Sequence, residues 1–98
     1  DGNIPTTFLL GQNYPNPFNP TTSIDFSLPR RSNVRLEVFS ITGELVNILT
    51  NQEMEPGNYK VNWDGKTADG FTLVSGIYIY RLNVDNQSVG SKKMILMK

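Results

Sequence analysis

The stretch Tyr78-Ile79-Tyr80-Arg81-Leu82-Asn83-Val84 alternates over most of its length between large apolar and polar side chains. Successive side chains of an extended backbone face opposite ways, so Tyr80 and Leu82 share one face while Arg81 occupies the other. A period of two is typical of a strand with one face on a hydrophobic core and one in water. The stretch therefore predicts a strand of an antiparallel sheet.

The same alternation recurs earlier in the chain, in Ile24–Leu28, Val34–Val38 and Tyr59–Trp63. Three further stretches are apolar but less regular, namely Phe8–Leu10, Leu45–Leu49 and Lys92–Met97. Turn-forming sequences such as Thr42-Gly43 and Asp85-Asn86-Gln87 separate these stretches. No window has a sustained period of 3.6 residues. The sequence therefore predicts an all-β, immunoglobulin-like antiparallel β-sandwich of about seven strands.

The alternation also predicts the core. We expect it to contain Ile24, Phe26, Leu28, Val34, Leu36, Val38, Tyr59, Val61, Trp63, Tyr78, Tyr80 and Leu82. The aromatic side chains of the strands lie on the same strand faces as the aliphatic ones. This favours packing in the core over an exposed platform on which carbohydrate could stack. Tyr78 follows Ser75-Gly76-Ile77 in the manner of a tyrosine corner, so its hydroxyl should bond to the backbone within residues 69–75.

The composition excludes several classes of site. The 98 residues include nine Lys+Arg and nine Asp+Glu but no His and no Cys, and the formal net charge is zero. Without Cys and His the chain lacks thiolate zinc sites, a cysteine nucleophile and the commonest general base. Phosphate binding needs an excess of Lys and Arg, so nucleic acid is not expected as a partner. We expect a non-catalytic domain with no cofactor.

A few carboxylates remain to be assigned. Asp64 and Asp69 lie in a Gly-rich stretch with Thr67 between them, and such oxygen ligands suit Ca²⁺. Aspartates in Gly-rich loops more often accept backbone N–H groups in turns, which is the interpretation we favour. Asp25 and Glu37 alternate with core residues, so they are expected to be solvated charges on the outer faces of the sheets.

The most unusual stretch is Tyr14-Pro15-Asn16-Pro17-Phe18-Asn19-Pro20, here called the proline-rich segment. Three prolines at this spacing fix φ repeatedly and bias the preceding residues toward extended backbone. We expect a rigid loop packed across one end of the sandwich, anchored by Tyr14 and Phe18. Asn16 and Asn19 should bond to nearby backbone. The segment lacks the spacing and basic flank of ligands for proline-reading domains.

Several blocks together resemble a known family. Leu10–Pro20, Thr22–Pro29 and Lys93–Lys98 resemble, in this order, blocks of the C-terminal sorting domains (type A) of the type IX secretion system. Gly57–Gly65 and Ser75–Tyr78 fit the same family, but they are shared with the immunoglobulin-like domain of flagellar hook-capping proteins. The match covers nearly the whole chain from about Phe8.

The resemblance implies a non-catalytic targeting domain of an exported protein. Residues 1–7 would be a linker from an upstream cargo domain, and residues 8–98 the sorting domain. The domain would act as a monomer that an outer-membrane translocon reads in the periplasm. A sortase-like surface protease removes such domains in many family members. The cargo would then reach the cell surface or the medium.

Two segments are candidates for recognition by the translocon: the proline-rich segment, and the end of the sequence, which is the stronger candidate. Lys92, Lys93 and Lys98 supply three cations without an acid, while Met94 and Leu96 lie among apolar residues on both faces. At a sheet edge this strand would offer unpaired N–H and C=O groups for strand addition. Alternatively, it is a central strand buried on both faces. A different function remains open, that of an accessory module binding polysaccharide or a neighbouring domain.

Overall fold

The computed structural model describes residues 4–98, so Asp1 to Asn3 of the expected linker 1–7 lie outside the described residues. Its seven strands are β1 (Leu9–Leu10), β2 (Thr22–Leu28), β3 (Ser32–Ser40), β4 (Leu45–Met54), β5 (Gly57–Trp63), β6 (Gly76–Val84) and β7 (Gln87–Leu96). The described residues contain no helix, and thus none long and apolar enough to cross a membrane.

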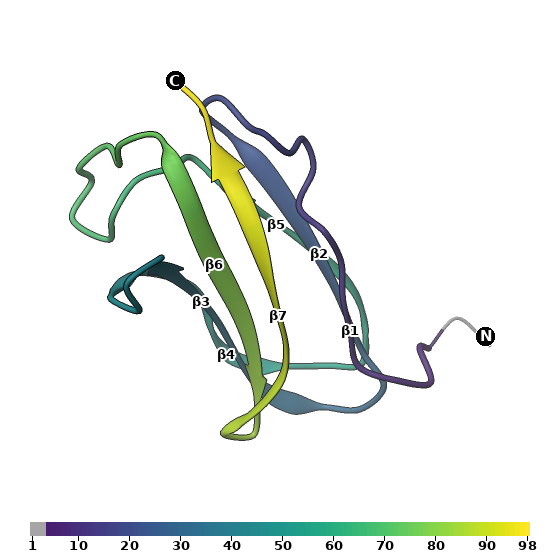
Figure 1. Cartoon of the computed structure of the whole chain (residues 1–98). Helices are drawn as coiled ribbons and strands as arrows, with labels where there is room; N and C mark the ends of the chain where they lie inside the picture. The colour runs from purple at the N-terminus through teal and green to yellow at the C-terminus, as the bar shows by residue number, and fades with distance from the viewer. Residues whose placement is uncertain (1–3) are drawn as a thin grey trace.

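The strands form two antiparallel sheets packed face to face (Figure 1). One sheet has the order β1-β2-β5 and the other the order β4-β3-β6-β7. This is the predicted immunoglobulin-like β-sandwich. Hairpins join β3 to β4 and β6 to β7, and the second of these turns at Asp85 and Asn86, with φ of 51° and 68°. Asp and Asn tolerate this left-handed conformation better than other residues with side chains.

The core lies between the two sheets. Its buried apolar residues are Phe18, Ile24, Phe26, Leu28, Val34, Leu36, Val38, Trp63, Tyr78, Tyr80, Leu82, Val84, Met94 and Leu96. Tyr59 and Val61 were also predicted to lie in the core, but they are only half-buried and pack against it from outside. Both lie on β5, an edge strand that has a neighbour on one side only. Tyr59 stacks on the core residue Phe26, with ring centroids 5.4 Å apart.

The tyrosine corner is present as predicted. The Tyr78 hydroxyl donates a 2.7 Å hydrogen bond to the Val74 carbonyl, within the expected range 69–75. Burial raises the pKa of Tyr78. The bond ties the start of β6 to the long loop that precedes it.

The less regular pattern of Leu45–Leu49 also has a structural cause. The ladder between β3 and β4 shifts register between Leu36 and Glu37 and again between Val38 and Phe39. Each shift inserts an extra residue on β4, which moves the following side chains to the opposite face. Strict alternation in the sequence is therefore lost, although β4 is a continuous strand.

Candidate functional site

The proline-rich segment lies along the outer edge of β7, where Figure 1 shows the early part of the chain passing close to the yellow strand. The Phe18 N–H donates to the Ile95 carbonyl, and the Phe18 carbonyl accepts from the Met97 N–H, both at 2.9 Å. The Asn16 Oδ1 atom accepts the Ile95 N–H at 2.9 Å. Two candidate segments from opposite ends of the sequence thus form one continuous surface.

The position of β7 in its sheet shows which of the two predicted arrangements, an edge strand or a central strand, is correct. It is an edge strand, with β6 as its only ladder partner in the four-stranded sheet. The expectation of free main-chain groups is nevertheless wrong for Ile95 and Met97, because the proline-rich segment already pairs with them. Met94 and Leu96 are buried in the core, whereas Ile95 and Met97 are exposed. The end of β7 therefore exposes side chains to solvent, whereas its main-chain groups are already paired.

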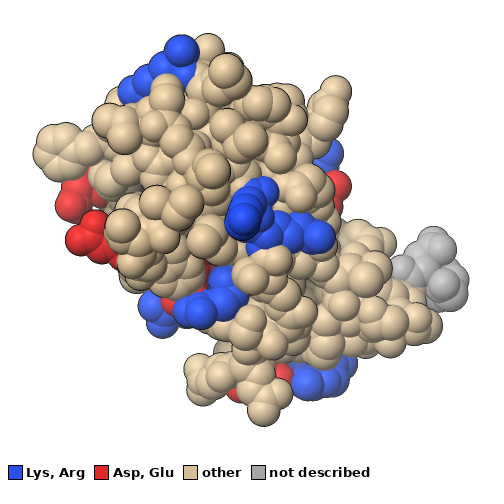
Figure 2. Space-filling view, viewed as in Figure 1, with Lys and Arg blue, Asp and Glu red and all other residues tan. Residues whose placement is uncertain are grey.

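The three lysines at this end of the chain differ in exposure. Lys93 and Lys98 are exposed, and Lys92 is half-buried. Lys98 is also held through its N–H, which donates to the Ser75 hydroxyl at 3.0 Å. On the face that Figure 2 shows, Lys and Arg form small separate groups and most of the surface is uncharged.

The two aromatic residues of the proline-rich segment behave differently. Phe18 is only 1% exposed, and its ring centroid lies 5.7 Å from that of Trp63, so it is the expected anchor. The expectation of a second anchor is wrong for Tyr14, whose side chain is 80% exposed. The Tyr14 backbone is nevertheless fixed, because its N–H and C=O both pair with Ser23 at 2.9 Å. The other members of the segment, Pro15, Asn16, Pro17, Asn19 and Pro20, are exposed.

A buried polar cluster holds the start of the segment in place. The Asn13 Nδ2 atom donates to the Thr22 hydroxyl at 3.0 Å and to the Pro15 carbonyl at 3.1 Å. Thr22 donates in turn to the Pro15 carbonyl at 2.9 Å. Gln12 donates through Nε2 to the Lys93 carbonyl at 2.8 Å, which adds a further bond to β7. Gln12 and Asn13 were not predicted as site residues, and the available signals were their position just before the proline-rich segment and their place in the Leu10–Pro20 block that resembles the sorting family.

Tyr80 connects this cluster to the centre of the fold. Its hydroxyl donates to the Gly11 carbonyl at 2.6 Å and accepts the Asn13 N–H at 2.8 Å. Burial raises the pKa of Tyr80 to about 12, although the bond from Asn13 acts in the opposite direction. Tyr80 was expected only to fill the core, but it also positions the chain that leads into the proline-rich segment.

The other end of the segment rests on Gly65. This glycine is buried and has φ of 75°, a conformation that residues with a side chain rarely adopt. A Cβ atom here would lie 3.1 Å from the Pro20 carbonyl oxygen and 3.7 Å from Leu96. The glycine of the Trp63-Asp64-Gly65 block therefore allows the segment, the turn and β7 to pack together.

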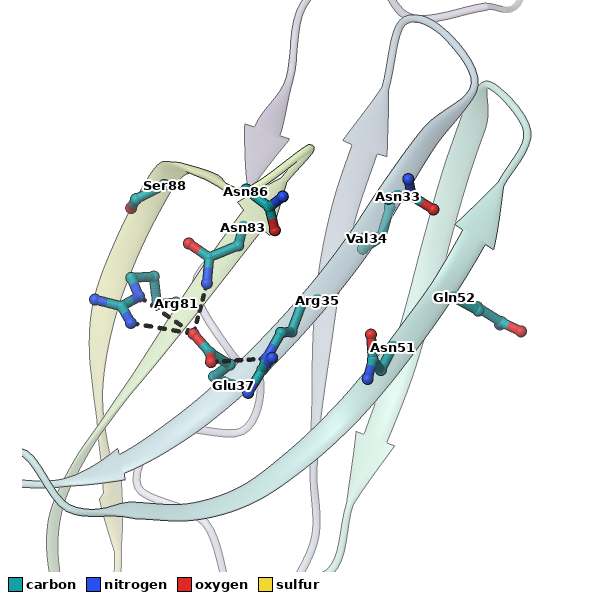
Figure 3. Close-up of a pocket in the computed structure, with 10 residues that line it drawn as sticks. All are labelled: Asn33, Val34, Arg35, Glu37, Asn51, Gln52, Arg81, Asn83, Asn86 and Ser88. Atoms are coloured by element: carbon teal, nitrogen blue, oxygen red, sulfur yellow. Dashed lines mark hydrogen bonds and ion pairs between the residues drawn. The ribbon is translucent and has the colours of Figure 1, made fainter.

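A second feature is a polar hollow of about 650 Å³ on the outer face of the four-stranded sheet (Figure 3). At its centre, the Glu37 Oε1 atom accepts hydrogen bonds from Asn83 at 2.6 Å and from two nitrogens of Arg81 at 3.1 and 3.3 Å. Arg35 Nε lies 2.8 Å from Oε2, in an ion pair whose alignment does not make a hydrogen bond. The expectation of a solvated carboxylate is wrong for Glu37, which is only 6% exposed, but it is right for Asp25.

The Gly-rich loop after β5 gives little support to a calcium site. Asp64 accepts the Lys66 N–H through Oδ1 at 3.2 Å, which is the turn role favoured for it. Asp69 is exposed. Within residues 4–98, no three or more acidic, His or Cys side chains gather in a way that could hold a metal ion.

Solved structures of other proteins share this fold. PorU from Porphyromonas gingivalis matches with a TM-score of 0.74 and 23% identity over 99% of this chain. PorZ from the same organism, described as an essential surface component of the type-IX secretion system, matches with a TM-score of 0.58 and 20% identity over 93% of this chain. FlgD from P. aeruginosa matches with a TM-score of 0.57 and 24% identity over 76% of this chain, and 59% of FlgD is covered.

The extent of these matches limits the conclusions that can be drawn from them. This chain spans only 10% of the PorU chain and 11% of the PorZ chain, and the low identities establish a common fold alone. No curated protein sequence matches the chain. The profile of the FlgD Ig-like domain family matches residues 14–88, which include the proline-rich segment and β2 to β6. That match covers well over half of the sequence, and the chain belongs to the FlgD Ig-like domain family.

Proposed function

We propose that this domain is a non-catalytic sorting signal of the type IX secretion system, which directs an attached cargo protein through the outer-membrane translocon. The observation that carries the proposal is the pairing of Phe18 with Ile95 and Met97. It joins the two segments that resemble the sorting family most specifically. A signal made of both segments would exist only in the folded domain.

The exposed groups of the two paired segments suit a protein partner. Tyr14 projects from the proline-rich segment, and Ile95 and Met97 project from the end of the chain. Lys93 and Lys98 add positive charge at the rim. Interfaces between proteins commonly combine exposed aromatic and aliphatic groups with such a polar rim.

The cargo domain precedes residue 8 in cis, and the protein passes through the periplasm to the cell surface or the medium. A sortase-like protease at the surface is a later partner. The fold shared with PorZ, itself described as a surface component of this secretion system, supports export.

A fusion experiment tests the proposal. A periplasm-targeted reporter is fused upstream of this domain and expressed in a host with a type IX system, and the reporter reaching the surface or medium is measured. The fusion should be exported, and the reporter alone should stay in the periplasm. Equal export of the two proteins would refute the sorting role.

Removal of Lys92–Lys98 should abolish export, but it also removes Met94 and Leu96 from the core. Burial of two such side chains contributes about 3 kcal/mol or more, so unfolding alone could stop export. The matched variant replaces Lys92, Lys93 and Lys98 by Gln, which keeps the core and removes the charge. Normal export of the deletion variant would show that the end of the chain is not the signal.

A further inference from the structure

The hollow around Glu37 is built across all four strands of its sheet. The register places Asn51, Arg35, Asn83 and Ser88 in one row from β4 to β7, with Glu37 and Arg81 paired in the adjacent row. Figure 3 shows Arg35, Arg81 and Asn83 converging on the Glu37 carboxylate. Asn33, Asn86 and the other lining residues surround this centre.

Glu37 holds the two guanidinium groups in fixed positions without using all of their donors. Each guanidinium carries five N–H donors, but Glu37 engages only Nε and Nη2 of Arg81 and Nε of Arg35. No protein acceptor among residues 4–98 takes the others. Two cations and one anion leave the hollow with a net charge of +1. The cluster is thus set up to receive one further carboxylate.

The rest of the lining identifies the kind of molecule that would carry this carboxylate. The side chains of Asn33, Asn51, Asn86 and Ser88 have no protein hydrogen-bond partner within the described part of the chain. Carboxamides both donate and accept, which matches the hydroxyl groups of a sugar. The volume of the hollow falls in the range of small-molecule sites.

An acidic peptide fits the hollow less well. Val34 is the only apolar residue among the ten that line it, so it has no pocket for an apolar anchor. Its floor is the face of β3 and β6, which are each already paired on both sides, so a peptide cannot add to the sheet there. None of the residues that line the hollow is aromatic, and the nearby Phe39 ring is covered by the Arg81 guanidinium at 4.7 Å, so a neutral sugar has no ring to stack on.

We propose that this hollow binds an acidic saccharide of the uronate class, with Arg35 and Arg81 engaging the carboxylate and the carboxamides engaging the hydroxyl groups. Glu37 is a positioning residue that orients both arginines. The site is separate from the surface formed by the proline-rich segment and the C-terminal end of β7, and it does not depend on the sorting function.

Titration of the intact domain with tetragalacturonate, followed by nuclear magnetic resonance, tests this proposal. The side-chain signals of Asn51, Asn83 and the Nε atoms of Arg35 and Arg81 should shift and reach saturation. Galactotetraose, which has the hydroxyl groups without the carboxylates, should cause no saturable shift. Absence of saturable shifts with tetragalacturonate would overturn the proposal, and equally tight binding of tetraglutamate would overturn the saccharide class.

A matched pair of variants separates this site from general charge effects. Asn51→Asp places a carboxylate opposite Arg35 and removes no protein contact, so it should weaken tetragalacturonate binding by about tenfold or more while the fold is kept. Asn62→Asp makes the same change on the other sheet, at an exposed position of β5, and should leave binding unchanged. Equal weakening by both variants would show non-specific attraction and overturn the proposal.

Discussion

The Tyr80 hydroxyl donates a 2.6 Å hydrogen bond to the carbonyl of Gly11, a residue 69 positions earlier in the chain. The same hydroxyl accepts the Asn13 N–H. Because Tyr80 lies on β6 in the middle of the four-stranded sheet, these bonds fix the chain before the proline-rich segment to the most buried part of the fold. We expect the placement of the segment along β7 to depend on this attachment.

Tyr80→Phe should lower the free energy of unfolding by about 1–3 kcal/mol, because it removes two hydrogen bonds and leaves buried backbone groups unpaired. It should also speed amide hydrogen exchange at Phe18 and Met97, whose N–H groups join the segment to the end of the chain. Urea denaturation and exchange measured by nuclear magnetic resonance test both effects. Unchanged exchange at Phe18 and Met97 would show that Tyr80 does not hold the segment.

Tyr78→Phe is the matched comparison, because it removes one tyrosine hydroxyl bond on the same strand without touching the proline-rich segment. The free energy of unfolding should fall by about 0.5–1.5 kcal/mol, the usual contribution of one hydrogen bond. Exchange at Phe18 should remain as in the unsubstituted domain. A loss well below about 0.5 kcal/mol would contradict the tyrosine corner as a stabilising contact.

The raised pKa of Tyr80 predicts a loss of stability at alkaline pH. Its pKa is about 12 in the folded domain and 10.0 in the absence of burial, so the folded state keeps the proton more tightly. The contribution of this group is fully present below about pH 10 and is lost as the pH rises through the folded value near 12. Free energies of unfolding measured from pH 8 upward should therefore decline less steeply for Tyr80→Phe. Parallel curves for the two proteins would rule out Tyr80 as the source.

Gly65→Ala should destabilise the domain by about 1–3 kcal/mol, through its left-handed backbone and the 3.1 Å approach to the Pro20 carbonyl oxygen. Gly70→Ala is the control, because its φ of 89° is also left-handed but nothing lies within 4 Å of the added Cβ. The excess cost at Gly65, measured by thermal or urea denaturation, reports on packing beneath the proline-rich segment. Equal costs at the two glycines would show that this contact contributes nothing.

The strands and most of the core were predictable because the alternation of apolar and polar residues directly reflects which side chains are buried. Ile24, Phe26 and Leu28 alternate in the sequence and face the core in the structure. The prediction failed where burial depends on the position of a strand in its sheet. Tyr59 has the same alternation but lies on the edge strand β5, and nothing local in the sequence distinguishes an edge from a centre.

The polar parts of the structure were harder to predict, because their partners are distant in sequence. Glu37 has the pattern of a solvated residue, yet Arg81 and Asn83 from 44 and 46 positions later cover it. The bond from Ile95 to Asn16 likewise spans 79 positions. Tyr14 and Phe18 look equivalent in the sequence, and only the fold shows that Phe18 is buried and Tyr14 is exposed.

Under the sorting proposal, the translocon reads the exposed surface of the proline-rich segment during export. The most direct measurement compares the exported fraction of the reporter fusion carrying Tyr14→Ser with that carrying Phe71→Ser. Both residues are exposed aromatics, at 80% and 71%, so neither change should unfold the domain, but Phe71 lies in the loop between β5 and β6. Export should fall with Tyr14→Ser and stay unchanged with Phe71→Ser. Undiminished export with Tyr14→Ser, or an equal fall with both variants, would contradict the claim.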